Sequence, residues 1–226
     1  VEYNERMMAP LRRDGLERVA YSPKEANIPG YSGHDALIRF YKDPAEWYGW
    51  TGEDPVVINI TQNLRQREPY TNWSFWEEAT RGLNRVPLGP GSEIIGGPGS
   101  LTYSEMQTWL QRARAYLYAG TQPASYTLGL IEAMMTGIPV VSIGPSWMRV
   151  FPYGPNLFEG HEIALWAEDD PANTQLIIKN LLRDDLPTSL ASVSRQTRQR
   201  AIDLFGKDKI AAEWAAFLGV RVPVAA

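Results

Sequence analysis

Two patterns in the sequence predict an α/β fold built on a parallel sheet with helices on both faces. From residue 55 onward, short β-branched and apolar runs alternate with longer segments whose apolar residues recur every three or four positions. Alternation of strands and helices is typical of a parallel sheet covered by helices. With 226 residues, 44% of them apolar, the chain can fill one substantial core.

Residues 1–54 differ from the remainder of the chain. A short helix is predicted over Glu5–Arg13, an apolar stretch follows at Arg18–Tyr21, and proline and glycine then dominate. We expect this part to be a lead-in or linker segment, and residues 55–226 to form the α/β domain. Aromatic residues crowd Leu37–Trp50, and they either seal an edge of the core or form a platform on which a sugar could stack.

The predicted elements of the α/β domain follow in order. Strands are expected at Val56–Ile60, Val86–Leu88, Glu93–Ile95, Tyr116–Ala119, Val140–Ile143 and Ile163–Trp166. Helices are expected at Trp73–Leu83, Ser104–Arg114, Thr127–Thr136, Pro171–Leu182, Leu186–Phe205 and Asp208–Leu218. Because Gly137 and Pro139 end the Thr127 helix just before a strand, the region around it is predicted to be a right-handed βαβ unit.

Composition excludes several classes of function. The 22 basic and 26 acidic residues give a net charge of −4, which argues against a nucleic-acid binder that relies on clustered cations. With no cysteine and only two histidines, His34 and His161, we expect no metal site and no thiol chemistry. No apolar run approaches the roughly 20 residues of a membrane-spanning helix, and residues 1–6 do not resemble a signal sequence, so we expect a cytoplasmic protein.

Three predicted loops follow strands, where open parallel sheets bind their ligands. They cover residues 61–70, the glycine-rich residues 96–100, and residues 120–126. The last of these leads into the Thr127 helix, whose free N–H groups and positive dipole end suit a phosphate or diphosphate. Glu132 lies inside this apolar helix, where its carboxylate either points to solvent, pairs with a nearby arginine, or binds a ligand.

Residues 118–144 read YAGTQPASYTLGLIEAMMTGIPVVSIG, and this segment resembles the donor-binding signature of GT-B glycosyltransferases. The likeness is greatest to the retaining enzymes that use nucleotide sugars. Their signature has a loop with Pro and Ser, a helix that carries Glu-Ala-Met, and a strand that begins Pro-Val-Val. The resemblance implies a Rossmann-like donor-binding lobe of a glycosyltransferase, which needs neither a cofactor nor a divalent metal.

The same resemblance implies roles for particular residues. Glu132 would bind the ribose, and Ser125, Tyr126, Thr127 and Leu128 would surround the diphosphate. Arg65 and Arg67 match, in type though not in register, the cations that stabilise the leaving diphosphate in this family. Their alternative is a solvated surface pair. Gly97 would let a nucleotide base approach the backbone of the glycine-rich loop, although a glycine cluster is also typical of a simple turn.

The predicted function is sugar transfer from a nucleoside diphosphate sugar to an acceptor that the sequence does not identify. We expect a second lobe upstream of residue 1, because 226 residues exceed one such lobe but do not reach two. Ala124 stands where the family has the earlier of its two signature glutamates, and this favours a non-catalytic binding or assembly module as the alternative. A sugar-nucleotide epimerase of the same architecture is a third interpretation.

Overall fold

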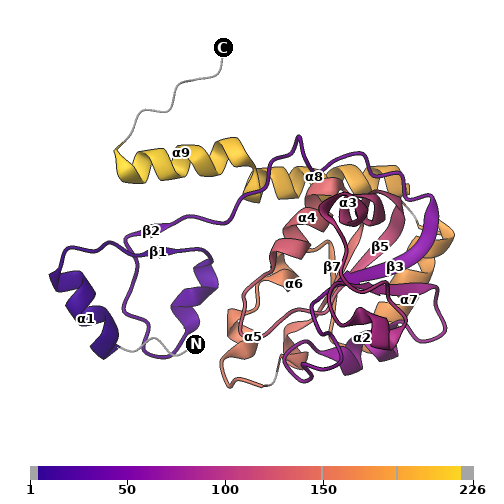
Figure 1. The fold of residues 1–226 in the computed structure, drawn as a ribbon, viewed down its shortest axis with the longest axis horizontal. Helices are drawn as coiled ribbons and strands as arrows, with labels where there is room; N and C mark the ends of the chain where they lie inside the picture. The colour runs from indigo at the N-terminus through magenta and orange to yellow at the C-terminus, as the bar shows by residue number, and fades with distance from the viewer. Residues whose placement is uncertain (1–4, 149, 187, 220–226) are drawn as a thin grey trace, which may run out of the picture.

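The computed structural model describes residues 5–148, 150–186 and 188–219. Its main feature is a five-stranded parallel sheet in the order β4-β3-β5-β6-β7 (Figure 1). The strands are β3 Asp54–Ile60, β4 Arg85–Leu88, β5 Ala113–Tyr118, β6 Val140–Ile143 and β7 Trp166–Glu168. The predicted α/β class with a parallel sheet is therefore confirmed.

Helices cover both faces of this sheet. One layer is formed by α2 Trp73–Ala79 and α7 Pro171–Arg183, and the other by α3 Tyr103–Arg112, α4 Leu128–Thr136 and α8 Leu190–Phe205 (Figure 1). Since both faces are covered, β6 is buried along its whole length and β5 at every position except Arg114. Right-handed connections place α3 and α4 on the same face, because each carries the chain in the same direction across the sheet.

The central βαβ unit fits closely. Gly129, near the start of α4, lies so near β3 that a Cβ built on it would be 3.3 Å from Ile60 Cγ2. At the other end, Gly137 ends α4 with φ of 100°, a backbone conformation that residues other than glycine rarely adopt. The glycine stop and the following Pro139 were predicted, and both hold α4 in register between β5 and β6.

The first part of the chain forms α1 Glu5–Arg13, the 3-10 helix η1 Pro23–Asn27, and the short strands β1 Val19–Ala20 and β2 Ala36–Leu37, which pair in parallel. In Figure 1 these elements lie to one side of the sheet, with η1 packed against α5 Gly154–Leu157. Trp47 is 2% exposed and Trp50 is half-buried, and both join the main core. Phe40, Tyr41 and Tyr48 stay exposed, so the aromatic stretch divides between core and surface.

Two strand predictions are wrong in whole or in part. Glu93–Ile95 belongs to a 3-10 helix, η2 Ser92–Ile95, because Gly91 and Gly96 on either side adopt left-handed conformations that turn the chain. The run Ile163–Trp166 contains only the first residue of β7, since Ile163 ends the short helix α6 Gly160–Ile163. The last helix, α9 Lys207–Leu218, follows α8 directly. Among the described residues, no helix is both long and apolar enough to cross a membrane.

Candidate functional site

The loops that follow β3, β4, β5 and β6 share one edge of the sheet, because all of these strands are parallel. Helix α4 begins at this edge, directly after β5 and its loop. Thr127 caps the helix, and its side chain accepts a hydrogen bond of 3.4 Å from the Leu130 N–H. The N–H groups of Leu128 and Gly129 find no acceptor among the described residues. They give this helix end an unpaired partial positive charge.

Glu132 projects from the same helix and is neither fully solvated nor bound to an arginine. Its Oε1 atom lies 2.5 Å from Lys42 Nζ, and the two side chains are 16% and 21% exposed. Lys42 also lies over the ring of Trp47, 5.5 Å from its centroid. The partner of Glu132 therefore comes from the segment that precedes the sheet, 90 positions earlier in the sequence.

The loop before α4 is more buried than its sequence suggests. Ser125 is fully buried and Tyr126 is 2% exposed. The Tyr126 hydroxyl donates a hydrogen bond of 2.6 Å to the Tyr21 carbonyl, and its ring contacts those of Phe40 and Phe205 edge-on or at a tilt. Burial raises the pKa of Tyr126 above its usual range. These side chains fix the loop, so its groups available to a ligand are mainly backbone N–H groups.

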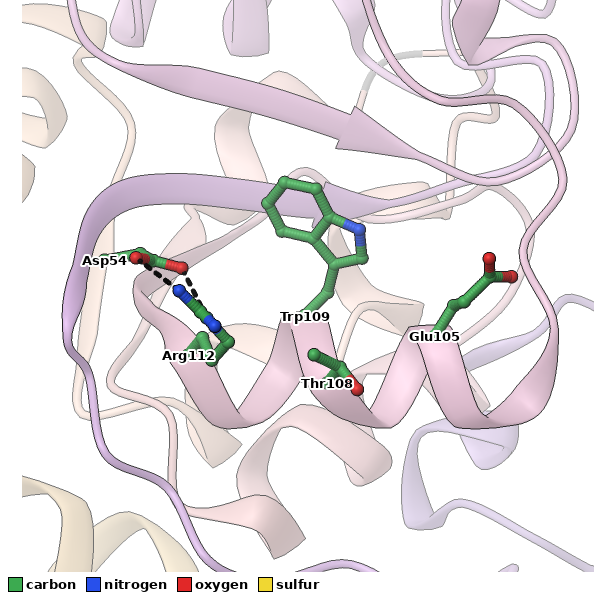
Figure 2. A pocket seen from close by; sticks show the side chains of 5 residues that line it. All are labelled: Asp54, Glu105, Thr108, Trp109 and Arg112. Atoms are coloured by element: carbon green, nitrogen blue, oxygen red, sulfur yellow. Dashed lines mark hydrogen bonds and ion pairs between the residues drawn. The ribbon is translucent and has the colours of Figure 1, made fainter.

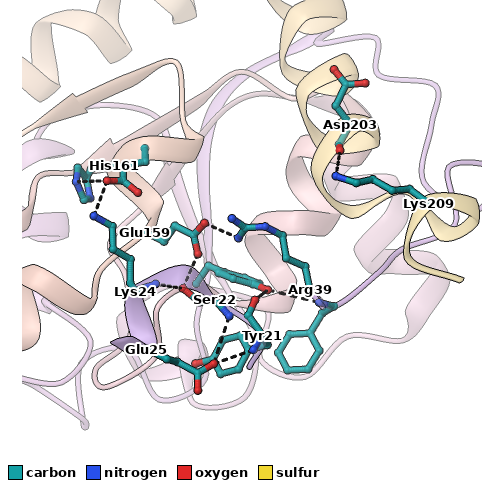
Figure 3. A network of polar contacts seen from close by, with 12 residues as sticks. Tyr21, Ser22, Lys24, Glu25, Arg39, Glu159, His161, Asp203 and Lys209 are labelled. Carbon is teal, nitrogen blue, oxygen red and sulfur yellow. Dashed lines mark hydrogen bonds and ion pairs between the residues drawn. The ribbon is translucent and has the colours of Figure 1, made fainter. Parts of the chain in front are cut away.

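A buried carboxylate stands behind this loop. Glu159 is 3% exposed, pairs with Arg39, and accepts a hydrogen bond of 2.7 Å from Ser22 Oγ (Figure 3). Its own N–H donates to the Ser125 carbonyl at 2.8 Å. This connection between the first forty residues and the loop was missed from the sequence. The available signal was a charged residue directly after Leu157 and Phe158, because a carboxylate that is buried with such neighbours must find a partner.

The remaining predicted site residues lie at the same edge of the sheet. Arg65 and Arg67 are exposed in the loop after β3, and neither makes an ion pair with another described residue. Gly97 lies against the end of β4, where an added Cβ would fall 2.1 Å from the Pro87 carbonyl oxygen. Its N–H donates to the Ser92 carbonyl at 2.9 Å. The glycine-rich loop is thus tightly folded upon η2.

Two other features lie outside this edge. A pocket of about 330 Å³ along the outer face of α3 is lined by Trp109, Glu105 and Thr108, with Arg112 bound to Asp54 at 2.8 and 3.2 Å (Figure 2). It reaches the amino end of β3, opposite the edge where α4 begins. Neither histidine joins a cluster of ligating side chains, and the described residues contain no group of three or more that could hold a metal ion.

Comparison with known protein families finds no match, and neither does comparison with curated protein sequences. Solved structures do match. HepE from Anabaena, solved in complex with UDP-glucose, aligns with 89% of this chain and 63% of its own, at 13% identity and a TM-score of 0.67. TarM aligns with 95% of this chain and 46% of its own, at 14% identity and a TM-score of 0.61.

A third match is AviGT4, a glycosyltransferase involved in avilamycin A biosynthesis. It aligns with 88% of this chain and 61% of its own, at 18% identity and a TM-score of 0.59. This chain thus spans less than two thirds of the length of each of these proteins. The shared architecture is a parallel sheet between two helical layers, and the chain therefore has the fold of a GT-B glycosyltransferase lobe.

Proposed function

We propose that this chain is the donor-binding lobe of a retaining glycosyltransferase that uses a nucleoside diphosphate sugar. The observation that carries the proposal is the position of α4. Its capped N-terminus opens at the ligand-binding edge of the sheet, and Glu132 lies half-buried on its second turn. Two neighbours with this fold were solved with uridine nucleotides, HepE with UDP-glucose and the pneumococcal transferase GtfA with UDP and GlcNAc, so UDP is the first ligand to test.

The charges at this edge suit a diphosphate. The N–H groups of Leu128 and Gly129 would bind phosphate oxygens at the start of α4. Of the two predicted cations, both exposed after β3, Arg67 would offset the negative charge that develops as the diphosphate leaves, whereas Arg65 lines a separate pocket beside α2. Ser125 and Tyr126 would shape the loop rather than contact the ligand through their buried side chains. Gly97 would allow the base to lie against the backbone after β4.

Glu132 would bind the ribose. Only its Oε1 atom is used by Lys42, and Oε2 accepts no hydrogen bond from the described residues. A ribose hydroxyl could therefore donate to Oε2 while the ion pair stays intact. In this scheme the acceptor binds mainly to a second lobe, and no metal ion takes part.

Isothermal titration calorimetry with UDP, GDP and ADP tests the donor site. We expect saturable binding of one nucleotide, which Glu132→Gln weakens about tenfold because a hydrogen bond to a charged group contributes about 1.5–3 kcal/mol. The control is Glu78→Gln, a change of the same type at an exposed position of α2. Absence of binding by all three nucleotides, or equal affinity of the Glu132 variant and wild type, would contradict the assignment.

A non-catalytic binding module is the second candidate, and Ala124 is the observation that favours it. This residue is half-buried in the turn before Ser125 and supplies no carboxylate toward the edge of the sheet. Such a module would bind nucleotide in the same titration but would neither transfer nor hydrolyse the sugar. Turnover of any nucleotide sugar in a panel assay would exclude it.

A further inference from the structure

A second pocket opens beside the edge strand β4, on the α2 side of the sheet. It has a volume of about 380 Å³ and is lined by Arg65, Trp73, Glu77, Arg85, Ile94 and Ile95. We call it the α2 pocket. Its size lies within the range of about 300–1,000 Å³ typical of small-molecule sites. Because Arg65 and η2 follow β3 and β4, the pocket touches the same edge of the sheet as the α4 N-terminus but lies two strands away from β5.

The two arginines of the α2 pocket differ in their bonding. Arg85 is fixed, since it pairs with Glu77 at 2.9 Å, donates to Thr80 Oγ1 at 2.9 Å and lies over the Trp76 ring. The guanidinium of Arg65 makes no hydrogen bond or ion pair within the part of the chain that the structure describes, and the residue is exposed. With Glu77 already paired, the pocket keeps one unused positive charge.

Beside its charged side chains, the α2 pocket is lined by one aromatic and two aliphatic side chains, Trp73, Ile94 and Ile95. Trp73 is half-buried and stacks on Trp76 with ring centroids 5.5 Å apart, which holds its indole in a fixed orientation. Ile94, which is 56% exposed, also lines the pocket. A guanidinium beside a fixed aromatic ring and an aliphatic side chain suits a ligand with a flat C–H face and one anionic group.

We propose that the α2 pocket binds a saccharide that carries a carboxylate or a phosphate, with Arg65 on the anion and Trp73 on the sugar ring. The choice of a saccharide rests on the proposed function. The pocket along α3 is a weaker candidate for this role, because its Arg112 and Asp54 already satisfy each other and Glu105 caps its own helix. In the proposed enzyme, the α2 pocket would hold part of an anionic acceptor or of the growing glycan.

NMR with the full chain tests this site. Saturation-transfer and 15N-indole spectra would be recorded with methyl glucuronide, glucose 6-phosphate, methyl glucoside and inorganic phosphate, and Trp73→Phe assigns the Trp73 indole signal. We expect at least one anionic sugar to shift that signal and to bind more tightly than both the neutral sugar and inorganic phosphate. The two anionic probes distinguish a carboxylate-bearing ligand from a phosphate-bearing one.

Arg65→Gln should lower the affinity for the anionic sugar about tenfold or more. Arg81→Gln, which removes the same charge from an exposed position beyond the end of α2, should leave its affinity unchanged. Saturating UDP should not displace the sugar. The proposal is overturned if neither anionic sugar binds, if the neutral sugar or inorganic phosphate binds equally well, if Arg65→Gln has no effect, or if UDP displaces the probe. UDP binding measured on the same sample shows separately whether the donor site is present.

Discussion

Replacing Arg39 with methionine should destabilise the fold far more than replacing an exposed arginine. Arg39 is the ion-pair partner of Glu159, whose side chain is only 3% exposed (Figure 3). Methionine keeps an apolar side chain of similar length but removes the guanidinium, whose central carbon lies 5.9 and 5.8 Å from the ring centroids of Tyr126 and Phe205. The buried carboxylate is then left with the Ser22 hydroxyl, at 2.7 Å, as its side-chain partner.

The magnitude follows from the burial of the two partners. Breaking a fully buried ion pair costs about 3–5 kcal/mol, because the remaining charge is uncompensated. Arg39 is 16% exposed, so water can reach the vacated position and lower this cost. We therefore expect a loss of about 2–3 kcal/mol in the free energy of unfolding. For a chain of this length, that loss corresponds to a decrease in Tm of roughly 4–12 °C.

Urea denaturation and calorimetry measure the effect. Arg195→Met is the control, since Arg195 is exposed on α8. The double variant Arg39→Met with Glu159→Gln should recover part of the loss, because an amide does not carry the desolvation cost of a charge. A free energy of unfolding for Arg39→Met within about 0.5 kcal/mol of the control would refute this explanation, because that is the range typical of surface substitutions. It is also refuted if the two changes destabilise additively.

Two further predictions concern the other parts of the fold. Gly97→Ala should cost about 1–3 kcal/mol in urea denaturation, because its Cβ would overlap the Pro87 carbonyl, whereas Ser100→Ala should change little. Hydrogen bonds from Lys207 and from the Ala45 N–H lower the pKa of Asp43, so this residue contributes stability above its unfolded pKa and loses it as pH falls through the folded pKa. In an NMR titration, Lys207→Gln should raise the pKa of Asp43; an unchanged value would show that the Lys207 contact is absent in solution.

The order of the main strands and helices was predictable because it depends on local periodicity. The strands at Val56–Ile60 and Val140–Ile143 and the helix up to Thr136 occur as expected. The strand predicted at Glu93–Ile95 failed because two β-branched residues outweighed the flanking glycines, which in fact bend the chain. Apolar character alone does not separate a strand from one turn of helix in so short a run.

The partners of the site residues could not be predicted in the same way. Glu132 pairs with Lys42, and Glu159 is linked to Ser22 across 137 positions of sequence. Neither contact follows from hydrophobic periodicity or from a sequence motif, because each depends on where the first fifty residues lie against the folded sheet. The resemblance indicated which residues could contact a nucleotide, and the fold shows that the side chains of Ser125 and Tyr126 in this loop are buried.

The first fifty residues contact two parts of the proposed donor site, the loop before α4 and the Glu132 carboxylate. The Tyr21 carbonyl accepts a hydrogen bond from the hydroxyl of Tyr126, in the loop that precedes α4, and Lys42 forms an ion pair with Glu132 on α4 itself. Trp47 fills the core close by, and its carbonyl accepts a hydrogen bond from Arg198 of α8. Removing residues before the predicted boundary at 54–55 would therefore uncover Tyr126, leave the Glu132 and Glu159 carboxylates without their cations, and open the core. The loop before α4, the Glu132 carboxylate and the first fifty residues form one packed structure. If they make up the proposed donor site, nucleotide affinity should depend on contacts made far from the nucleotide.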